Sequence, residues 1–197
     1  IRQHGYYFLF TRTMELLKGL VRGHKDLLKE FCREHAISFY VVDDHNSESC
    51  LQILQSLQAD VLITANTRII KGHIIKTPAR AAVNLHTSKL HQYAGLDSIF
   101  WALYHAEEEI GVSIHFLEEG LDTGDIITQR TIPVTADDDL SSLTAKAHAT
   151  GAQLMVKTIE QFENGDFSGV AQDLSRRTYF SWPTPDQRKE LRRRLHP

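Results

Sequence analysis

Two short apolar runs that open into polar residues constrain the fold of this chain more than any other feature. The first run is Val61-Leu62-Ile63-Thr64, and the second is Ala81-Ala82-Val83, which continues as Asn84-Leu85-His86. A run of this kind is typical of a buried strand that reaches the edge of a sheet. Because helical patterns alternate with these strands, the sequence predicts an α/β fold with a largely parallel sheet.

Amphipathic periodicity predicts the remaining elements. The expected set is a helix carrying Leu16, Leu17, Leu20 and Val21 that ends near Gly23, a helix around 27–32, a strand at 38–42, a helix at 50–57 capped by Asn46 or Ser47, a helix capped by Asp97 or Ser98, strands at 111–116 and 126–134, and a long helix at about 138–164. We therefore expect a Rossmann-like fold, a twisted and mostly parallel sheet with helices on both faces. No Gly-x-Gly-x-x-Gly occurs, so the sequence does not support dinucleotide binding.

Asn84 and His86 stand at the polar end of the second run. Side chains alternate along a strand, so these two project from one face while Leu85 points to the other. The carboxyl ends of strands are where open α/β sheets bind their ligands. An amide donor and an imidazole are thus expected side by side at a ligand-binding edge.

Asp122 follows in the stretch Gly120-Leu121-Asp122-Thr123-Gly124-Asp125, a glycine-flanked turn that lets backbone approach a ligand closely. An amide, an imidazole and a carboxylate suit acyl transfer to an amine. The amide can hold a developing oxyanion, the imidazole can handle a proton, and the carboxylate can orient the imidazole. Taken singly, each residue is most simply a turn or strand-end residue, so the prediction rests on their combination.

Three separated motifs resemble, in order, those of the folate-dependent formyltransferase family. They are Asn84-Leu85-His86-Thr87-Ser88 leading to Tyr93-Ala94-Gly95, then Gly120-Leu121-Asp122-Thr123-Gly124-Asp125, and the closing Thr178-Tyr179-Phe180-Ser181-Trp182-Pro183. The likeness covers roughly residues 25 to 187. It implies a Rossmann-like formyltransferase fold and transfer of a formyl group from 10-formyltetrahydrofolate to a primary amine. It also implies that Asn84, His86 and Asp122 are the catalytic residues.

The resemblance also implies two binding regions. For the folate, it points to Arg68, Ile69 and Ile70 in the loop after the first run, together with Leu121 and Gly124 of the turn. Backbone groups of such a loop can bind the edge of a pterin while aliphatic side chains cover its faces. For the acceptor, it points to Ser88, Tyr93, Gly95 and, through stacking on a base, Trp182, for which docking of the C-terminal segment is an equal alternative.

The sequence departs from the family pattern in two places. His91 and Ala94 stand where many members have Pro and Arg, which removes a forked donor near the site. The chain also starts at Ile1 without the strand, helix and strand that open other members. We therefore predict a catalytic domain over residues 1–187 that lacks this first part, followed by a basic tail at 188–197.

The sequence of residues 95–104 is most similar to that of family members that formylate amino sugars carried on nucleotides. The family's tRNA enzymes carry a second, β-barrel domain that a chain of 197 residues leaves no room for. A nucleotide-linked amino sugar is therefore the expected acceptor. Two alternatives stay open: a hydrolase that gives the formyl group to water, and a non-catalytic remnant with a binding role.

Composition and charge limit the classes of partner expected for this protein. An apolar share of 42%, a charged share of 24% and a formal net charge of −3 are ordinary for a cytoplasmic globular protein and argue against a nucleic-acid partner. The apolar run at residues 5–10 is too short to span a membrane. No histidine pair has metal-ligand spacing with a third ligand, so we expect no metal. Cys32 and Cys50 are expected to be buried thiols, and a homo-oligomer is left open.

Overall fold

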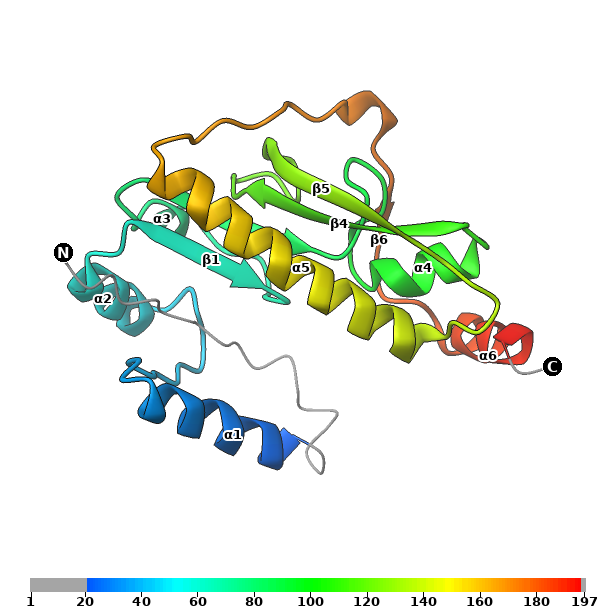
Figure 1. Ribbon diagram of the computed structural model, residues 1–197, viewed down its shortest axis with the longest axis horizontal. Coiled ribbons are helices and arrows are strands. Elements are labelled where there is room, and N and C mark those ends of the chain that lie inside the picture. The colour runs from blue at the N-terminus through cyan, green and yellow to red at the C-terminus, as the bar shows by residue number, and fades with distance from the viewer. Residues whose placement is uncertain (1–20, 196–197) are drawn as a thin grey trace. The chain divides into compact units, whose positions relative to one another are not determined.

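The computed structural model describes residues 21–195 of the chain (Figure 1). The chain divides into two compact units, residues 1–82 and residues 83–197, and each is described by itself. The helix expected over residues 16–21 falls mostly outside the described residues. Among the described residues, no helix is both long and apolar enough to cross a membrane.

From residue 21 onward, the first unit contains three helices and a strand before its last residues enter β2 (Ala81–His86). These are α1 (Val21–Glu34), α2 (Glu48–Leu57), β1 (Val61–Ala65) and α3 (Gly72–Ile75). The Ser47 hydroxyl caps α2 by accepting a hydrogen bond from the Cys50 backbone N–H, as the sequence predicts for this position. Both cysteines, Cys32 in α1 and Cys50 in α2, are buried thiols without a disulfide.

Two expectations for the first unit are wrong. No helix ends near Gly23, because α1 runs through this residue as one continuous helix. A single glycine costs a helix only about 1 kcal/mol, which is too little to break it. Residues 38–42 form no strand although their side chains favour one, and Val41 is 70% exposed. A strand needs a hydrogen-bonded neighbour, which composition alone does not supply.

The second unit carries the rest of the described chain. Its elements are β3 (Ala94–Gly95), α4 (Ser98–Tyr104), β4 (Glu109–Phe116), β5 (Ile126–Pro133), α5 (Leu140–Glu163), a 3-10 turn (Leu174–Arg176), β6 (Tyr179–Phe180) and α6 (Pro185–Leu195). These bounds lie within two residues of the expected strands at 111–116 and 126–134 and of the expected long helix.

The α/β fold class is confirmed, and the strand directions add detail to it. In the second unit β4 lies between β2 and β5, and it is antiparallel to both. The short β3 pairs in parallel with β6. The alternation that favoured parallel strands concerned the two runs at 61–64 and 81–84. It did not extend to β4 and β5, which follow one another through a short connection, the kind that joins antiparallel strands.

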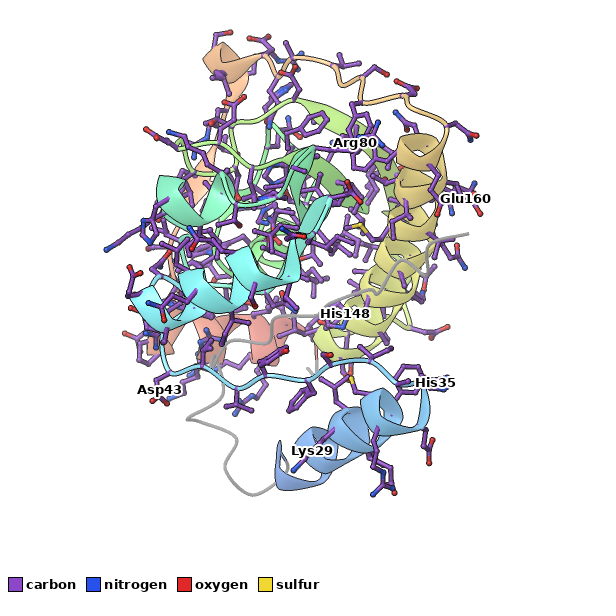
Figure 2. All side chains as sticks on the ribbon, turned by 90° about the vertical axis from the view of Figure 1, so that its left-hand side faces the viewer. Lys29, His35, Asp43, Arg80, His148 and Glu160 are labelled. Atoms are coloured by element: carbon purple, nitrogen blue, oxygen red, sulfur yellow. The ribbon has the colours of Figure 1, made fainter. Side chains whose placement is uncertain are left out.

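The central strand β4 is buried along almost its whole length and forms the core of the sheet. α5 packs on β4 and β5 through Leu143, Ala147 and Leu154 (Figure 1). His148 and Glu160, both labelled in Figure 2, are exposed residues of this helix. Asp139 and Ser142 form a reciprocal capping box at its start. The helix α5 therefore supports β4 and β5 by packing against them.

The basic end of the chain forms a helix that packs on the second unit up to Leu195. α6 begins at Pro185, so the expected boundary between residues 187 and 188 falls inside a helix. Leu191 is buried, the Tyr104 hydroxyl donates to the Glu190 carboxylate over 2.6 Å, and Arg188 donates to Asp97 over 2.9 Å. These contacts attach α6 to α4 within the second unit.

Candidate active site

The polar end of β2 faces the neighbouring strand in a defined register. Asn84 lies opposite His115 of β4, and His86 lies opposite Ser113. Directly opposite residues of antiparallel strands project to the same face of the sheet. Four polar side chains from two strands are thereby gathered on one face.

His86 contacts both a backbone carbonyl and the predicted carboxylate. Its Nε2 lies 3.1 Å from the Tyr93 carbonyl oxygen, which can only accept, so this nitrogen carries the proton. The same nitrogen is 4.0 Å from Asp122 Oδ2, and the two side chains are only 12% and 11% exposed. Asp122 therefore lies on the same side of the sheet as His86, as predicted.

Asp122 occupies a turn that other parts of the unit hold in place. Its φ is +52°, a left-handed conformation that Asp tolerates better than most residues. The Gly95 backbone N–H donates to Asp122 Oδ2 over 2.8 Å. Gln172 Nε2 donates to the carbonyls of Asp122 and Gly124, over 3.0 and 2.7 Å, and Arg177 donates to the Leu121 carbonyl over 2.9 Å.

Sequence reasoning missed His115, which is 1% exposed and completes the cluster. Its Nδ1 lies 2.8 Å from the Phe116 carbonyl oxygen, and its Nε2 lies 3.2 Å from Asn84 Nδ2 and 3.8 Å from Asp122 Oδ1. Burial lowers the pKa of His115, against the opposing influence of the Phe116 hydrogen bond and of Asp122. A signal was present, because Ser113 and His115 alternate with apolar residues as Asn84 and His86 do.

Gln172 and Arg177 were also missed, and no sequence signal marks them. They reach the Asp122 turn from about fifty residues further along the chain. The segment that carries them has little regular structure, so no periodicity singles it out.

The residues predicted for the acceptor are found in three different settings. Ser88 is buried and its hydroxyl donates to the Gln92 carbonyl, so it shapes its own loop. Gly95 has a φ of +98°, and an added Cβ would stand 2.3 Å from the Phe180 carbonyl oxygen. Trp182 is 58% exposed. A role in binding the acceptor stays a prediction for each of them.

Tyr93 connects to the site through its backbone, because its carbonyl accepts from His86. Its hydroxyl points to Glu107 and donates to that carboxylate over 2.6 Å. Burial, followed by the bond to Glu107, raises the pKa of Tyr93 above its usual range. The phenol therefore remains protonated, and the acceptor role predicted for Tyr93 stays a prediction.

Arg68, Ile69 and Ile70 belong to the first unit and are described there. Ile70 is buried at 7% exposure, whereas Ile69 is 69% exposed. The Ile69 carbonyl accepts a hydrogen bond from Asn46 Nδ2 over 2.9 Å. The exposed Ile69 side chain and the fixed backbone have the chemistry expected of a loop that binds a flat heterocycle. Binding of the folate by Arg68, Ile69 and Ile70 stays a prediction.

The cluster in the second unit combines an amide donor, two imidazoles and a carboxylate in a mostly buried setting. Such a set can hold a developing oxyanion and move a proton. Among the residues that the structure describes, no group of three or more His, Cys, Asp or Glu side chains has the arrangement of a metal site.

Comparisons with known proteins show which family this chain resembles. The methionyl-tRNA formyltransferase of Listeria innocua is 35% identical over 153 residues, which are 77% of this chain and 49% of that protein. The chain thus spans about half the length of the curated relatives it matches.

Solved structures add two sugar-related relatives. The formyltransferase PseJ from Anoxybacillus kamchatkensis, in complex with UDP-4,6-dideoxy-4-formamido-L-AltNAc and tetrahydrofolate, is 25% identical with a TM-score of 0.63, over 85% of each chain. The N-formyltransferase from Helicobacter canadensis, in complex with folinic acid and dTDP-3-aminofucose, is 28% identical with a TM-score of 0.52. That match covers 58% of this chain and 42% of that one. The family model described as formyl transferase matches residues 26–159, and the chain belongs to that family.

Proposed function

We propose that this chain carries the catalytic site of an enzyme that moves a formyl group from 10-formyltetrahydrofolate to a primary amine. The observation that supports this most is the position of the Asp122 carboxylate, 4.0 Å from His86 Nε2 on the face that also carries Asn84. These are the three residues that the family motifs single out.

In the proposed reaction, the amine nitrogen attacks the formyl carbon and forms the new C–N bond. The carbonyl oxygen then carries negative charge, which the Asn84 amide and the charged form of His86 stabilise. Asp122 balances the charge on His86 and helps to remove the proton from the attacking amine. The bond between the formyl carbon and N10 breaks, N10 takes up a proton, and tetrahydrofolate leaves. Each donor to such an oxyanion is worth about 3 to 4 kcal/mol.

Arg68, Ile69 and Ile70 of the first unit are proposed to contact the formyl donor, and the same role is proposed for Leu121 and Gly124 of the second unit. We expect Ile69→Asp to abolish binding of a folate analogue in a titration, because a charge would replace an exposed apolar side chain. Val41→Asp is the matched control, since Val41 is an equally exposed aliphatic residue of the same unit at 70%. Equal affinities of Ile69→Asp and the parent protein would contradict the assignment.

For the acceptor, we propose the amine of a nucleotide-linked amino sugar. PseJ and the Helicobacter canadensis enzyme, both solved with sugar nucleotides, support this class. The Listeria innocua relative supports a second candidate, the amino group of methionyl-tRNA. The expectation from chain length does not weigh against tRNA, because the chain matches only about half of that relative.

One assay separates these candidates. Purified protein is incubated with 10-formyltetrahydrofolate alone, with UDP- or dTDP-linked amino sugars, or with methionyl-tRNA, and release of tetrahydrofolate is followed. Sugar-dependent release supports the proposal, and tRNA-dependent release supports the second candidate. Release without any amine indicates a hydrolase. A folded sample that releases none under any condition contradicts the proposed activity and favours the binding remnant.

A further inference from the structure

His115 contacts the predicted oxyanion-binding residue from the neighbouring strand. Asn84 and His115 are register partners in the β2–β4 pair, so their side chains leave the sheet on the same face. His115 Nε2 and Asn84 Nδ2 are 3.2 Å apart, and the histidine is 1% exposed. A buried pair at this distance constrains both partners.

The hydrogen-bond partners of His115 define its protonation. Nδ1 is 2.8 Å from the Phe116 carbonyl oxygen, which has no proton to give, so Nδ1 carries the hydrogen. Burial, the largest influence on this group, lowers the pKa of His115 and keeps the ring neutral. A neutral ring carries only one hydrogen, so Nε2 presents a lone pair.

This lone pair determines how the Asn84 amide is turned. The amide oxygen has no proton to donate, so only the NH2 end of Asn84 can bind the bare Nε2. The same Nε2 lies 3.8 Å from Asp122 Oδ1, so the Asn84 NH2 group and the carboxylate both lie near one ring nitrogen. With the amide turned the other way, its carbonyl oxygen would face the lone pair of Nε2, and an acceptor would stand where the donor is needed.

We propose that His115, as the neutral Nδ1–H tautomer, is a positioning residue that holds the donor end of the Asn84 amide toward the reacting carbonyl. Its effect on the oxyanion rests on the proposed formyl transfer, whereas its tautomer and its effect on Asn84 do not. The first test below is therefore independent of activity.

The first test is NMR of protein labelled with ¹⁵N and ¹³C in histidine, at pH 7. The sequence holds 11 histidines, and the His115 signals are assigned by their loss in His115→Gln. We expect the chemical shifts of a neutral ring with hydrogen on Nδ1. A ring protonated on Nε2, or on both nitrogens, overturns the proposal whether or not the protein is active.

The second test compares two amides at position 115. A Gln side chain reaches the place of Nε2 with an oxygen that can accept from Asn84, whereas an Asn side chain reaches only the place of Nδ1. We expect His115→Gln to retain most of the parent kcat and His115→Asn to lose about 100-fold, with little change in KM. Thermal unfolding of both variants shows whether each remains folded.

The outcomes separate this proposal from the proposed function. Equal losses of kcat in two folded variants, or no loss in either, would contradict a positioning role. If His115→Asn does not fold, a large loss of kcat in a folded His115→Gln contradicts the role by itself. Absence of formyl transfer by the parent protein would count against the proposed function, and the NMR result would still decide the tautomer.

Discussion

The loop at residues 66–71 and the turn that carries Asp122 are held in place by different means. In the first unit, a single side chain, Asn46, makes two bonds to the loop backbone: it accepts from the Lys71 N–H over 2.7 Å and donates to the Ile69 carbonyl over 2.9 Å. His45 Nε2 lies 3.2 Å from the same Ile69 carbonyl. Asn46 therefore supplies two of these three side-chain contacts with the loop.

In the second unit, three residues from two segments of the chain hold the Asp122 turn. Gln172 binds two of its carbonyls, Arg177 binds a third, and the Gly95 N–H binds the carboxylate itself. Loss of one of these contacts leaves the others. The comparison teaches that the proposed folate loop should respond sharply to one substitution, whereas the position of Asp122 should tolerate the loss of a supporting residue.

The largest effect is expected at the reacting groups of the second unit. We expect His86→Ala and Asp122→Asn each to lose about 100-fold or more in kcat while the protein stays folded, because each removes a positioned acid, base or counter-charge. Steady-state kinetics and circular dichroism measure the two properties. Unchanged turnover in a folded His86→Ala protein would mean that the catalytic residues are assigned wrongly.

The next effect tests the dependence of the folate loop on Asn46. Asn46→Ala removes both side-chain bonds to the loop, and at about 1 kcal/mol per bond we expect roughly tenfold weaker binding of a folate analogue. Gln52→Ala is a matched control, because Gln52 is an exposed amide on α2 whose side chain donates to Glu48 of the same helix. Equal affinity of Asn46→Ala and Gln52→Ala would remove the contrast between the two regions.

A smaller effect is expected for Gln172→Ala. It removes two of the bonds to the Asp122 turn, but Arg177 and Gly95 still hold it, so we expect a loss of only about threefold in kcat. Gln153→Ala on the exposed side of α5 serves as the control. A loss as large as that of Asp122→Asn would show that the turn lacks the redundancy inferred from its contacts.

The smallest effect is expected at the start of α5, which lies outside both regions. Lys146, followed by Ser142, holds the pKa of the Asp138 carboxyl well below its usual range. A depressed pKa stabilises the fold above about pH 4 and loses this effect as the pH falls. We expect Lys146→Met to unfold more easily in urea than the parent at pH 7, with a smaller difference at pH 3. Lys157→Met on the same helix should show no such pH dependence.

The sequence predicted the elements whose residues repeat with a clear period. β2, β4, β5 and α5 were found within a few residues, and Ser47 was one of the two caps named for α2. The strand predicted at residues 38–42 does not form, because strand-favouring side chains do not show whether a partner strand is present. The helix end predicted near Gly23 is wrong because an isolated glycine does not by itself end a helix.

The site was predictable where chemistry and local pattern coincide. Asn84 and His86 follow from strand alternation, and Asp122 follows from its glycine-flanked turn. His115 shows the same alternation with apolar residues, but the antiparallel register was needed to show that it lies opposite Asn84. Gln172 and Arg177 act on backbone carbonyls far along the chain, and long-range contacts of this kind leave no trace in local sequence.

The positive φ of Asp122 limits which substitutions can report on its carboxylate. Apart from Gly, Asn and Asp are the residues whose backbone most readily adopts this left-handed conformation. Replacement by Ala, Glu or a β-branched residue would disturb the turn as well as remove or move the charge. Asparagine keeps the shape and the backbone preference while it removes only the charge. In a library of all substitutions at this position, Asp122→Asn is therefore the variant whose loss of turnover can be read as the effect of the charge.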